Sequence, residues 1–421
     1  MIQKISQIIE IPELRKRLLY VVYILCLYRV GSHIPISGLD MNALQALFSQ
    51  GGVLGFFNLF SGGGLERFSI FALGILPYIN ASIIMQLLTV ISPQLKELAQ
   101  EGESGRKQLS QYTRYFAVVL SVVQAIVMTI GFKGFLLPGA SFSFFLLYAV
   151  VSLVAGATLV MWFGELMTEH GIGNGASLLI FLGIIAQMPS YIKNTYILYQ
   201  GGTSLLNILV LVAVILLMIL SIIYIQEAER KVPVQYAKRV IGRKMVGAQK
   251  TYIPLRLIQG GVMPIIFASA ILQFPLILTQ FINVPSIQNF FGTYYQYDGV
   301  AYNLFFCILI FFFAYFYTAI TFNPNDISDN IKKNGGFIMG VRPGSPTVDF
   351  LEGILTKLTF IGASFLAIIA LTPVVAANMT NVNSFMGLGG TAILIIVGVA
   401  MDLVKQIEVF VLAQRYEGVL E

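Results

Sequence analysis

The chain has 421 residues, of which 57% are hydrophobic and only 11% are charged, with a formal net charge of +6. Soluble globular domains carry about 25% charged residues, so this composition excludes that class and indicates an integral membrane protein. Apolar runs of about 20 residues recur along the chain and leave no room for a separate soluble domain. We predict ten spans, at about 18–37, 68–91, 115–135, 144–167, 175–194, 205–226, 254–281, 301–322, 356–377 and 389–409.

The basic residues indicate the orientation of these spans. Of the 26 Lys and Arg residues, 22 fall on one side of the membrane if ten helices alternate. The positive-inside rule then places both termini and two large loops, about 227–253 and 323–355, in the cytoplasm. Arg29 lies near the end of the first span, from which it can snorkel to the opposite surface. No small-residue cleavage site follows that span, so we expect no cleavable signal peptide.

Reactive side chains are sparse. Cys26 and Cys307 both lie inside predicted spans, where packing is their expected role. His33 and His170 are isolated, without the spacing of a metal site. No paired carboxylates or Ser/His arrangement lies within a span, so we expect neither a cofactor nor enzymatic activity.

The stretch from Gly55 to Val90 organises the first half of the chain. A short apolar piece, Gly55 to Phe60, is followed by three glycines and a charged pair, and then by about 24 mainly apolar residues. The first piece is too short to cross and must turn back, whereas the second is long enough for a span. Irregular backbone at membrane depth requires surrounding protein or a water-filled cavity. This stretch therefore predicts a cavity.

One helical stripe of the second predicted span changes from apolar to polar. Its members, at helical spacing, are Ile75, Ile79, Ser82, Gln86 and Thr89. The polar half either meets water or forms hydrogen bonds with neighbouring helices, and spacing alone does not separate these alternatives. The seventh span repeats the pattern, with Gln259, Ile266 and Gln273 every seven residues on one face.

The segment 226–256 is the most basic part of the chain, with eight Lys and Arg residues. Val232, Val234 and Tyr236 alternate with polar residues, which favours a short strand or hairpin. The loop is either a topology signal or a docking surface for RNA phosphates or an acidic partner protein.

Several long motifs, in order along almost the whole chain, resemble the SecY family, the channel subunits of the bacterial protein translocase. They include RVGSHIPISG, FSGGGLERFSIFALGILPYINASIIMQLLTV, EGESGRKQLSQYTRY, WFGELMTEHGIGNGASLLIF, EAERKVPVQYAKRVIGRKM, GVMPIIFASAIL and GGTAILIIVGVAMD. The resemblance implies an all-α polytopic fold with ten transmembrane helices in two inverted, pseudo-symmetric halves, 1–194 and 195–421, around a central pore. A re-entrant plug at about 55–67 would close the pore.

The resemblance also implies roles for individual residues. The pore ring would consist of Ile75, Ile79, Ile180, Ile266 and Ile395, and the plug of Phe57, Asn58, Phe60, Ser61, Gly62, Gly63, Gly64 and Leu65. The lateral gate would consist of Ser82, Gln86, Thr89, Gln259, Ser269 and Gln273. The residues that dock partners would be Arg239, Arg243, Lys244, Lys250 and Arg342. The family usually has asparagine where this chain has Ile258, followed by Gln259.

The function implied is a passive pore in the bacterial cytoplasmic membrane. It would conduct unfolded secretory polypeptides with signal sequences and release hydrophobic segments sideways into membrane lipids. The implied partners are SecE, SecG, the motor ATPase SecA and the ribosome, which supply the energy because the chain has no ATP-binding motif. An ion-coupled secondary transporter is the alternative. Such proteins bury ionisable residues at mid-membrane, whereas Arg29, Glu165 and Asp402 all lie near span ends.

Overall fold

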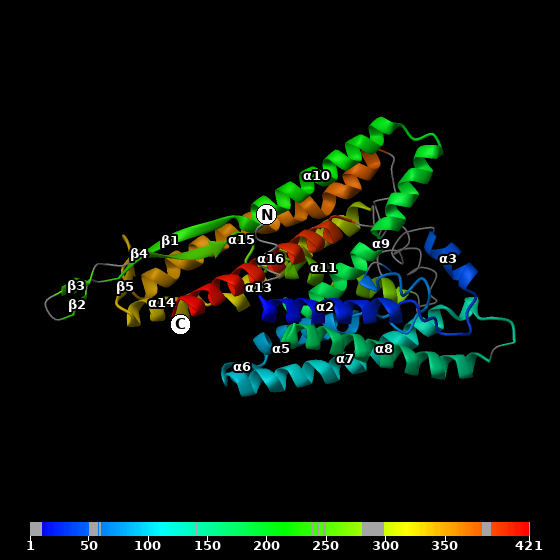
Figure 1. Ribbon diagram of the computed structural model, residues 1–421, viewed down its shortest axis with the longest axis horizontal. Coiled ribbons are helices and arrows are strands. Elements are labelled where there is room, and N and C mark those ends of the chain that lie inside the picture. The colour runs from blue at the N-terminus through cyan, green and yellow to red at the C-terminus, as the bar shows by residue number, and fades with distance from the viewer. Residues whose placement is uncertain are drawn as a thin grey trace.

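The structure is a computed structural model that describes residues 11–49, 58, 60–139, 141–236, 239–241, 244–246, 250–279, 299–380 and 389–420. Helices dominate it (Figure 1). The first half contains α2 (Pro12–Gly31), α3 (Met41–Ser49), α5 (Leu76–Ile91), α6 (Pro93–Gln100), α7 (Glu103–Gly131), the short 3-10 helix η1 (Lys133–Phe135), α8 (Phe142–His170) and α9 (Gly175–Gln200). The second half contains α10 (Leu205–Glu227), α11 (Met263–Thr279), α13 (Val300–Thr321), α14 (Pro324–Lys333), α15 (Ser345–Thr380) and α16 (Gly389–Leu420).

A helix occupies most of each of the ten predicted spans. Among the described residues, six helical stretches are by themselves long and apolar enough to cross a membrane, and α5 with α6 forms a pair bent by 101° that passes as a seventh. Large apolar side chains face outward on these helices, such as Leu216 and Leu220 on α10. The chain is therefore an all-α polytopic membrane protein.

Three predicted spans extend well beyond the helices that they contain. The second was expected to be helical from residue 68, but residues 68–75 form turns and α5 begins at Leu76. Phe68 and Gly74 both have positive φ, 43° and 56°, which a helix does not allow. The first span was expected to reach residue 37, but α2 ends at Gly31.

The third difference concerns the seventh span, which was expected to begin at residue 254. Residues up to Arg256 belong to a strand, Gly261 has a φ of 56°, and α11 begins at Met263. Gln259 therefore precedes the helix. The prediction that Gln259, Ile266 and Gln273 share one helical face is wrong for this reason.

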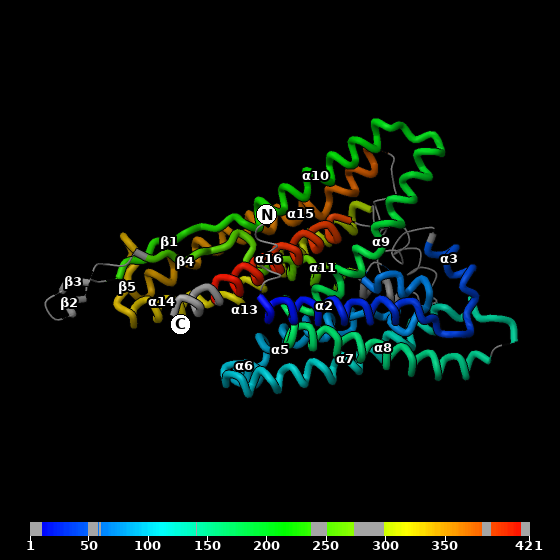
Figure 2. The backbone as a smooth tube through the Cα atoms, viewed as in Figure 1, coloured from blue at the N-terminus to red at the C-terminus, as the bar shows by residue number. Residues whose placement is uncertain are grey.

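The helices pack as two groups. In the first group α2 packs on α8, and α7 packs on both α5 and α8; in the second α15 packs on α10, α13 and α16. Figure 1 shows the first group below and the second above, and Figure 2 shows the chain turning from α9 into α10 where it passes between them. The groups meet where α5 packs on α11 and α9 packs on α16. One hydrophobic core runs across this junction.

A small antiparallel sheet projects from the ends of the helices in the second group. Strand β1 (Glu229–Tyr236) pairs with β4 (Lys250–Arg256) on one side and β5 (Gly336–Ile338) on the other. The predicted hairpin is confirmed, and Val232 and Val234 are buried against α15, as their alternation requires. A shorter hairpin, β2 (Arg239–Ile241) with β3 (Lys244–Val246), extends beyond it. We call this side of the molecule the basic end.

Candidate functional site at the junction of the helix groups

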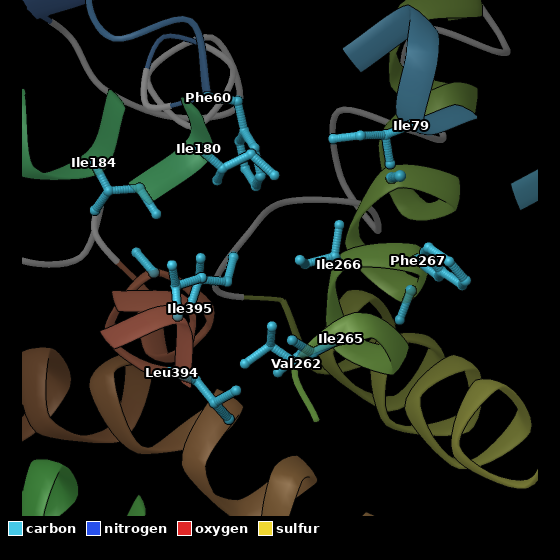
Figure 3. Close-up of a cluster of buried hydrophobic side chains, with 14 of the residues drawn as sticks. Phe60, Ile79, Ile180, Ile184, Val262, Ile265, Ile266, Phe267, Leu394 and Ile395 are labelled. Atoms are coloured by element: carbon cyan, nitrogen blue, oxygen red, sulfur yellow. The ribbon is translucent and has the colours of Figure 1, made fainter. Parts of the chain in front are cut away.

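Five isoleucines from both helix groups are buried in the hydrophobic core that crosses the junction. Their side chains are between 0% and 6% exposed and belong to one hydrophobic cluster. Figure 3 shows four of them pointing toward one another from α5, α9, α11 and α16. We call this set the waist cluster: Ile75, Ile79, Ile180, Ile266 and Ile395.

The waist cluster brings distant parts of the chain to one place. Ile75 caps the start of α5, and Ile79 follows one turn later. Ile180 is in the first two turns of α9, which Asn174 caps by accepting from the N–H of Ser177 at 3.1 Å. Every side chain in the cluster is a branched aliphatic without a polar atom. The arrangement can therefore exclude water and ions but cannot select a ligand by hydrogen bonding.

The segment that the sequence predicts as a plug covers one side of the cluster. Phe60 is 3% exposed, shares the same hydrophobic core and lies beside Ile180 in Figure 3. The described members of the set are all buried: Asn58, Phe60, Ser61, Gly62, Gly63, Gly64 and Leu65. Phe57 lies outside the described residues. We call the described residues 58 and 60–67 the plug segment.

Glycines give the plug segment its shape. Gly62 and Gly63 have φ of 64° and 84°, in the left-handed region that favours glycine. A Cβ on Gly62 would lie 3.2 Å from the Cα of Gly183 on α9. The glycine run therefore supplies both the turn and a close approach to α9.

The predicted gate residues of α5 form hydrogen bonds within their own helix. Gln86 donates its Nε2 to Ser82 Oγ at 3.4 Å, and Thr89 Oγ1 donates to the carbonyl of Met85 at 2.7 Å. All three predicted side chains are half-buried. Among the described residues these hydrogen bonds stay within α5, and the seam between α5 and α11 is formed by packing.

The predicted gate residues near α11 occupy different surroundings. Ser269 is buried and donates to the carbonyl of Ile266 at 2.8 Å. Gln259 lines a small cleft with Thr318 of α13 and Thr359 of α15, and its buried Nε2 has no hydrogen-bond partner among the described residues. The structure therefore places Gln259 at the α13–α15 contact, apart from the gate residues of α5. The side chain of Gln273 lies outside the described residues.

The predicted docking residues gather on the sheet at the basic end. The backbones of Arg239, Lys244 and Lys250 lie in β2, β3 and β4, while Arg243 lies outside the described residues. Arg342 follows β5, and its carbonyl accepts from Thr347 Oγ1 at 2.9 Å at the start of α15. Because β5 pairs with β1, the two loops form one surface.

Comparison with known proteins agrees with this architecture. A family model described as SecY matches residues 69–404. Curated relatives named protein translocase subunit SecY include that of Thermotoga maritima, 41% identical over 100% of this chain and 98% of the relative, and that of Thermus thermophilus, 44% identical over 98% and 96%. This chain belongs to the SecY family.

Solved structures show the same fold for this SecY-family chain. A structure titled as that of a protein conducting channel aligns with a TM-score of 0.66 at 18% identity, over 93% of this chain and 91% of the other. A structure of Sec61 from a canine ribosome–channel complex of the endoplasmic reticulum aligns with a TM-score of 0.62 at 17% identity, over the same shares. Similarity at this level of identity establishes the fold.

Two side chains that contact the plug segment were not predicted as site residues. Arg29 was expected to snorkel outward, but its Nη1 donates to the carbonyl of Gly62 at 2.6 Å. Gln187 of α9 donates its Nε2 to the carbonyl of Asn58 at 2.7 Å. A signal was present in the sequence, because Gln187 is an isolated amide in an apolar predicted span, where a polar side chain needs a partner.

Proposed function

We propose that this chain is the pore-forming subunit of a protein translocase, a passive channel that conducts unfolded polypeptides across the membrane. The observation that carries the proposal is the waist cluster, in which four helices of two packing groups direct isoleucine side chains toward one another. The names of the relatives and the channel structures support the same function.

The chemistry of the waist cluster suits a pore that conducts polypeptides of many different sequences. A narrow aliphatic collar is poorly wetted, so an ion that enters it loses hydration without gaining a ligand. A passing polypeptide meets contacts that have no directional requirement and therefore accept any side chain. The plug segment, packed on the collar through Phe60, would close the pore between substrates.

We infer that residues 1–194 and 195–421 are two inverted halves and that the seam between α5 and α11 is the lateral exit. The two packing groups support the division, because α5 with α11 and α9 with α16 are the main contacts between them. The hydrogen bonds of Ser82, Gln86 and Thr89 lie within α5, so separating α5 from α11 leaves them intact. An apolar segment in the pore would then move into lipid, a gain of about 0.8 kcal/mol for each buried CH2.

The energy for transport would come from partners that dock at the basic end. The Sec61 relative was solved in a ribosome–channel complex, which supports a ribosome as one partner. The bacterial relatives support a position in the bacterial cytoplasmic membrane, and the positive-inside rule supports an orientation with both termini and the sheet in the cytoplasm. We propose that Arg239, Arg243, Lys244, Lys250 and Arg342 contact the ribosome or the motor ATPase SecA, and that SecE and SecG complete the complex.

An ion-coupled transporter is the alternative, and the position of its required carboxylates argues against it. Asp402 lies at the basic end, near Arg256 and Lys405. Glu165 pairs with Arg114 at 2.6 Å between α8 and α7. Among the described residues no group of three or more His, Cys, Asp or Glu side chains gathers as an ion site would require.

Photo-crosslinking of a stalled secretory chain tests the pore. A probe replaces Ile79, which is buried in the waist cluster, and a matched probe replaces Ile84, half-buried on another face of α5. We expect strong adducts from position 79 and few from position 84. Equal labelling, or no labelling at either position despite confirmed translocation, would refute the pore assignment.

A further inference from the structure

The plug segment is bound together internally. The carbonyl of Asn58 accepts from the N–H of Gly63 at 2.9 Å and from Ser61 Oγ at 3.2 Å. The side chain of Asn58 forms two further bonds with Glu66, donating to its Oε2 at 3.1 Å and accepting from its N–H at 3.0 Å. Ser61 Oγ also accepts from the N–H of Leu65 at 3.0 Å. With its two ends fastened to each other, the segment can leave its seat as one piece.

Side chains outside the segment donate two of the hydrogen bonds that hold it in place, and both donors come from the first helix group. Arg29, at the end of α2, donates to Gly62, and Gln187, in the middle of α9, donates to Asn58. Both acceptors are backbone carbonyls, which are independent of the residue type at those positions. The Gln187 bond reaches the same carbonyl that closes the internal turn of the segment.

We propose that Arg29 and Gln187 are positioning residues that latch the closed plug segment to α2 and α9, and that Arg67 opposes this latch. The proposal rests on the proposed function, because it assumes that the segment closes a pore. Beyond that function, the proposal identifies the side chains that hold the plug segment and assigns the segment to the first helix group.

The opposing element is the charge of Arg67. Its guanidinium is near enough to that of Arg29 to repel it. Its Nη1 is buried and has no hydrogen-bond partner among the described residues, and an unpaired buried donor is costly. The closed position therefore combines two hydrogen bonds with one unfavourable pair of charges, and loss of the Gln187 bond leaves the repulsion between Arg29 and Arg67 less opposed.

The latch has a consequence for opening. Separating α5 from α11 moves the two helix groups apart but breaks neither bond, since α2, α9 and the plug segment all belong to the first group. Release requires another acceptor for the guanidinium and the amide. An extended polypeptide in the pore offers backbone carbonyls of the same kind, so substrate chemistry itself can displace the plug.

Solvent access to the plug segment tests the latch. In a chain with Cys26→Ala and Cys307→Ala, Leu65→Cys places one thiol at a position that is 5% exposed and keeps the backbone N–H bonded to Ser61. The protein is reconstituted with its partner subunits in lipid vesicles, and the rate of labelling by a membrane-impermeant maleimide is measured without substrate. Translocation of a secretory precursor is measured in the same vesicles.

We expect Arg29→Met and Gln187→Leu each to raise the labelling rate severalfold, because Arg29→Met removes the stronger, charged hydrogen bond but also removes the repulsion between Arg29 and Arg67. Arg29→Lys should recover part of the loss, and Arg67→Met should slow labelling. The controls are Lys193→Met, an exposed cation on α9, and Gln124→Leu, a half-buried amide on α7, and neither should change the rate.

Labelling of Arg29→Met and Gln187→Leu at the parent rate would overturn the latch, as would equal acceleration in the two controls. The parent chain carries Leu65→Cys and an intact latch. If this parent translocates no precursor, the proposed function is overturned instead. The two failures are distinguishable, because the first is a ratio between variants and the second is a property of the parent.

Discussion

The waist cluster and the plug segment lie in contact but are built from opposite kinds of interaction. The waist is made of five aliphatic side chains of one hydrophobic cluster, which have no hydrogen-bonding atoms. The plug segment is held by directional bonds, at 2.6 Å from Arg29 and 2.7 Å from Gln187, and by glycines with positive φ. Phe60 is the point where the two meet.

This difference matches what each region must do. Aliphatic contacts lose little free energy when one chain replaces another, so the waist can close on any occupant. Directional bonds are satisfied in one geometry only, so the plug segment has one seat to which it returns. A non-specific seal and a specific closed position are therefore separate parts of the molecule.

The largest expected effect comes from placing a polar group in the waist. Ile266→Asn puts an amide at a position that is 2% exposed, where water can then hydrate the collar and lower the barrier to ions. We expect the ion conductance of the substrate-free channel in a planar bilayer to rise by an order of magnitude or more. Ile266→Val, which keeps the surface aliphatic, is the control.

If the Ile266→Asn channel conducts no more than the Ile266→Val channel, the waist does not seal the pore. The plug segment alone would then be the barrier to ions, and the division between a non-specific seal at the waist and a specific closed position of the plug segment would be wrong.

A smaller rise in conductance is expected from a substitution that disrupts the contact between the plug segment and α9. Gly62→Val places a side chain where φ is 64° and where a Cβ meets the Cα of Gly183 at 3.2 Å. Left-handed backbone alone costs a non-glycine residue about 1–2 kcal/mol. We expect severalfold faster maleimide labelling at Leu65→Cys, with the conductance raised less than by Ile266→Asn.

Gly102→Val is the matched control for that variant. Gly102 also has positive φ, 82°, but nothing lies within 4 Å of its added Cβ. If both glycine variants accelerate labelling equally, the effect is general backbone strain and the seat against α9 is irrelevant.

Sequence analysis predicted the helices of this fold better than their ends. Apolar runs locate a span because lipid requires them, and each predicted span contains a helix. The start of α5 at Leu76 was missed because residues 68–75 are as apolar as the helix that follows, and their turns depend on Gly74 and on pairing between Pro35 and Ser69. Hydropathy does not report such long-range contacts.

The candidate site was predictable to the extent that packing alone defines it. The five isoleucines of the waist cluster were named from sequence motifs, and all five belong to one buried hydrophobic cluster. The partners of the plug segment were not, since Arg29 and Gln187 lie 33 and 129 residues from the residues that they contact. The isolated amide of Gln187 indicated that it needs a partner, but the acceptors are backbone carbonyls, so no pattern of side chains could show where those partners lie.

The smallest expected effect on conduction comes from breaking an ion pair that lies apart from both the waist cluster and the plug segment. Arg114 of α7 donates to Glu165 of α8 at 2.6 Å, and the carboxylate side chain is 15% exposed. Arg114→Met leaves this largely buried carboxylate unpaired, and we expect about 1–3 kcal/mol of destabilisation, less than for a fully buried pair because the arginine is partly solvated. The midpoint of thermal unfolding in detergent should fall, while conductance and labelling at position 65 stay unchanged.

Lys107→Met provides the comparison for that change. Lys107 pairs with Glu103 at 2.8 Å, but both side chains are more than 70% exposed, and such surface pairs contribute about 0–1 kcal/mol. A conductance that rises in Arg114→Met but not in Lys107→Met would mean that the α7–α8 contact also sets the closed state. Closure would then depend on directional bonds throughout the first helix group, and the plug segment would be only one of several elements that hold the pore shut.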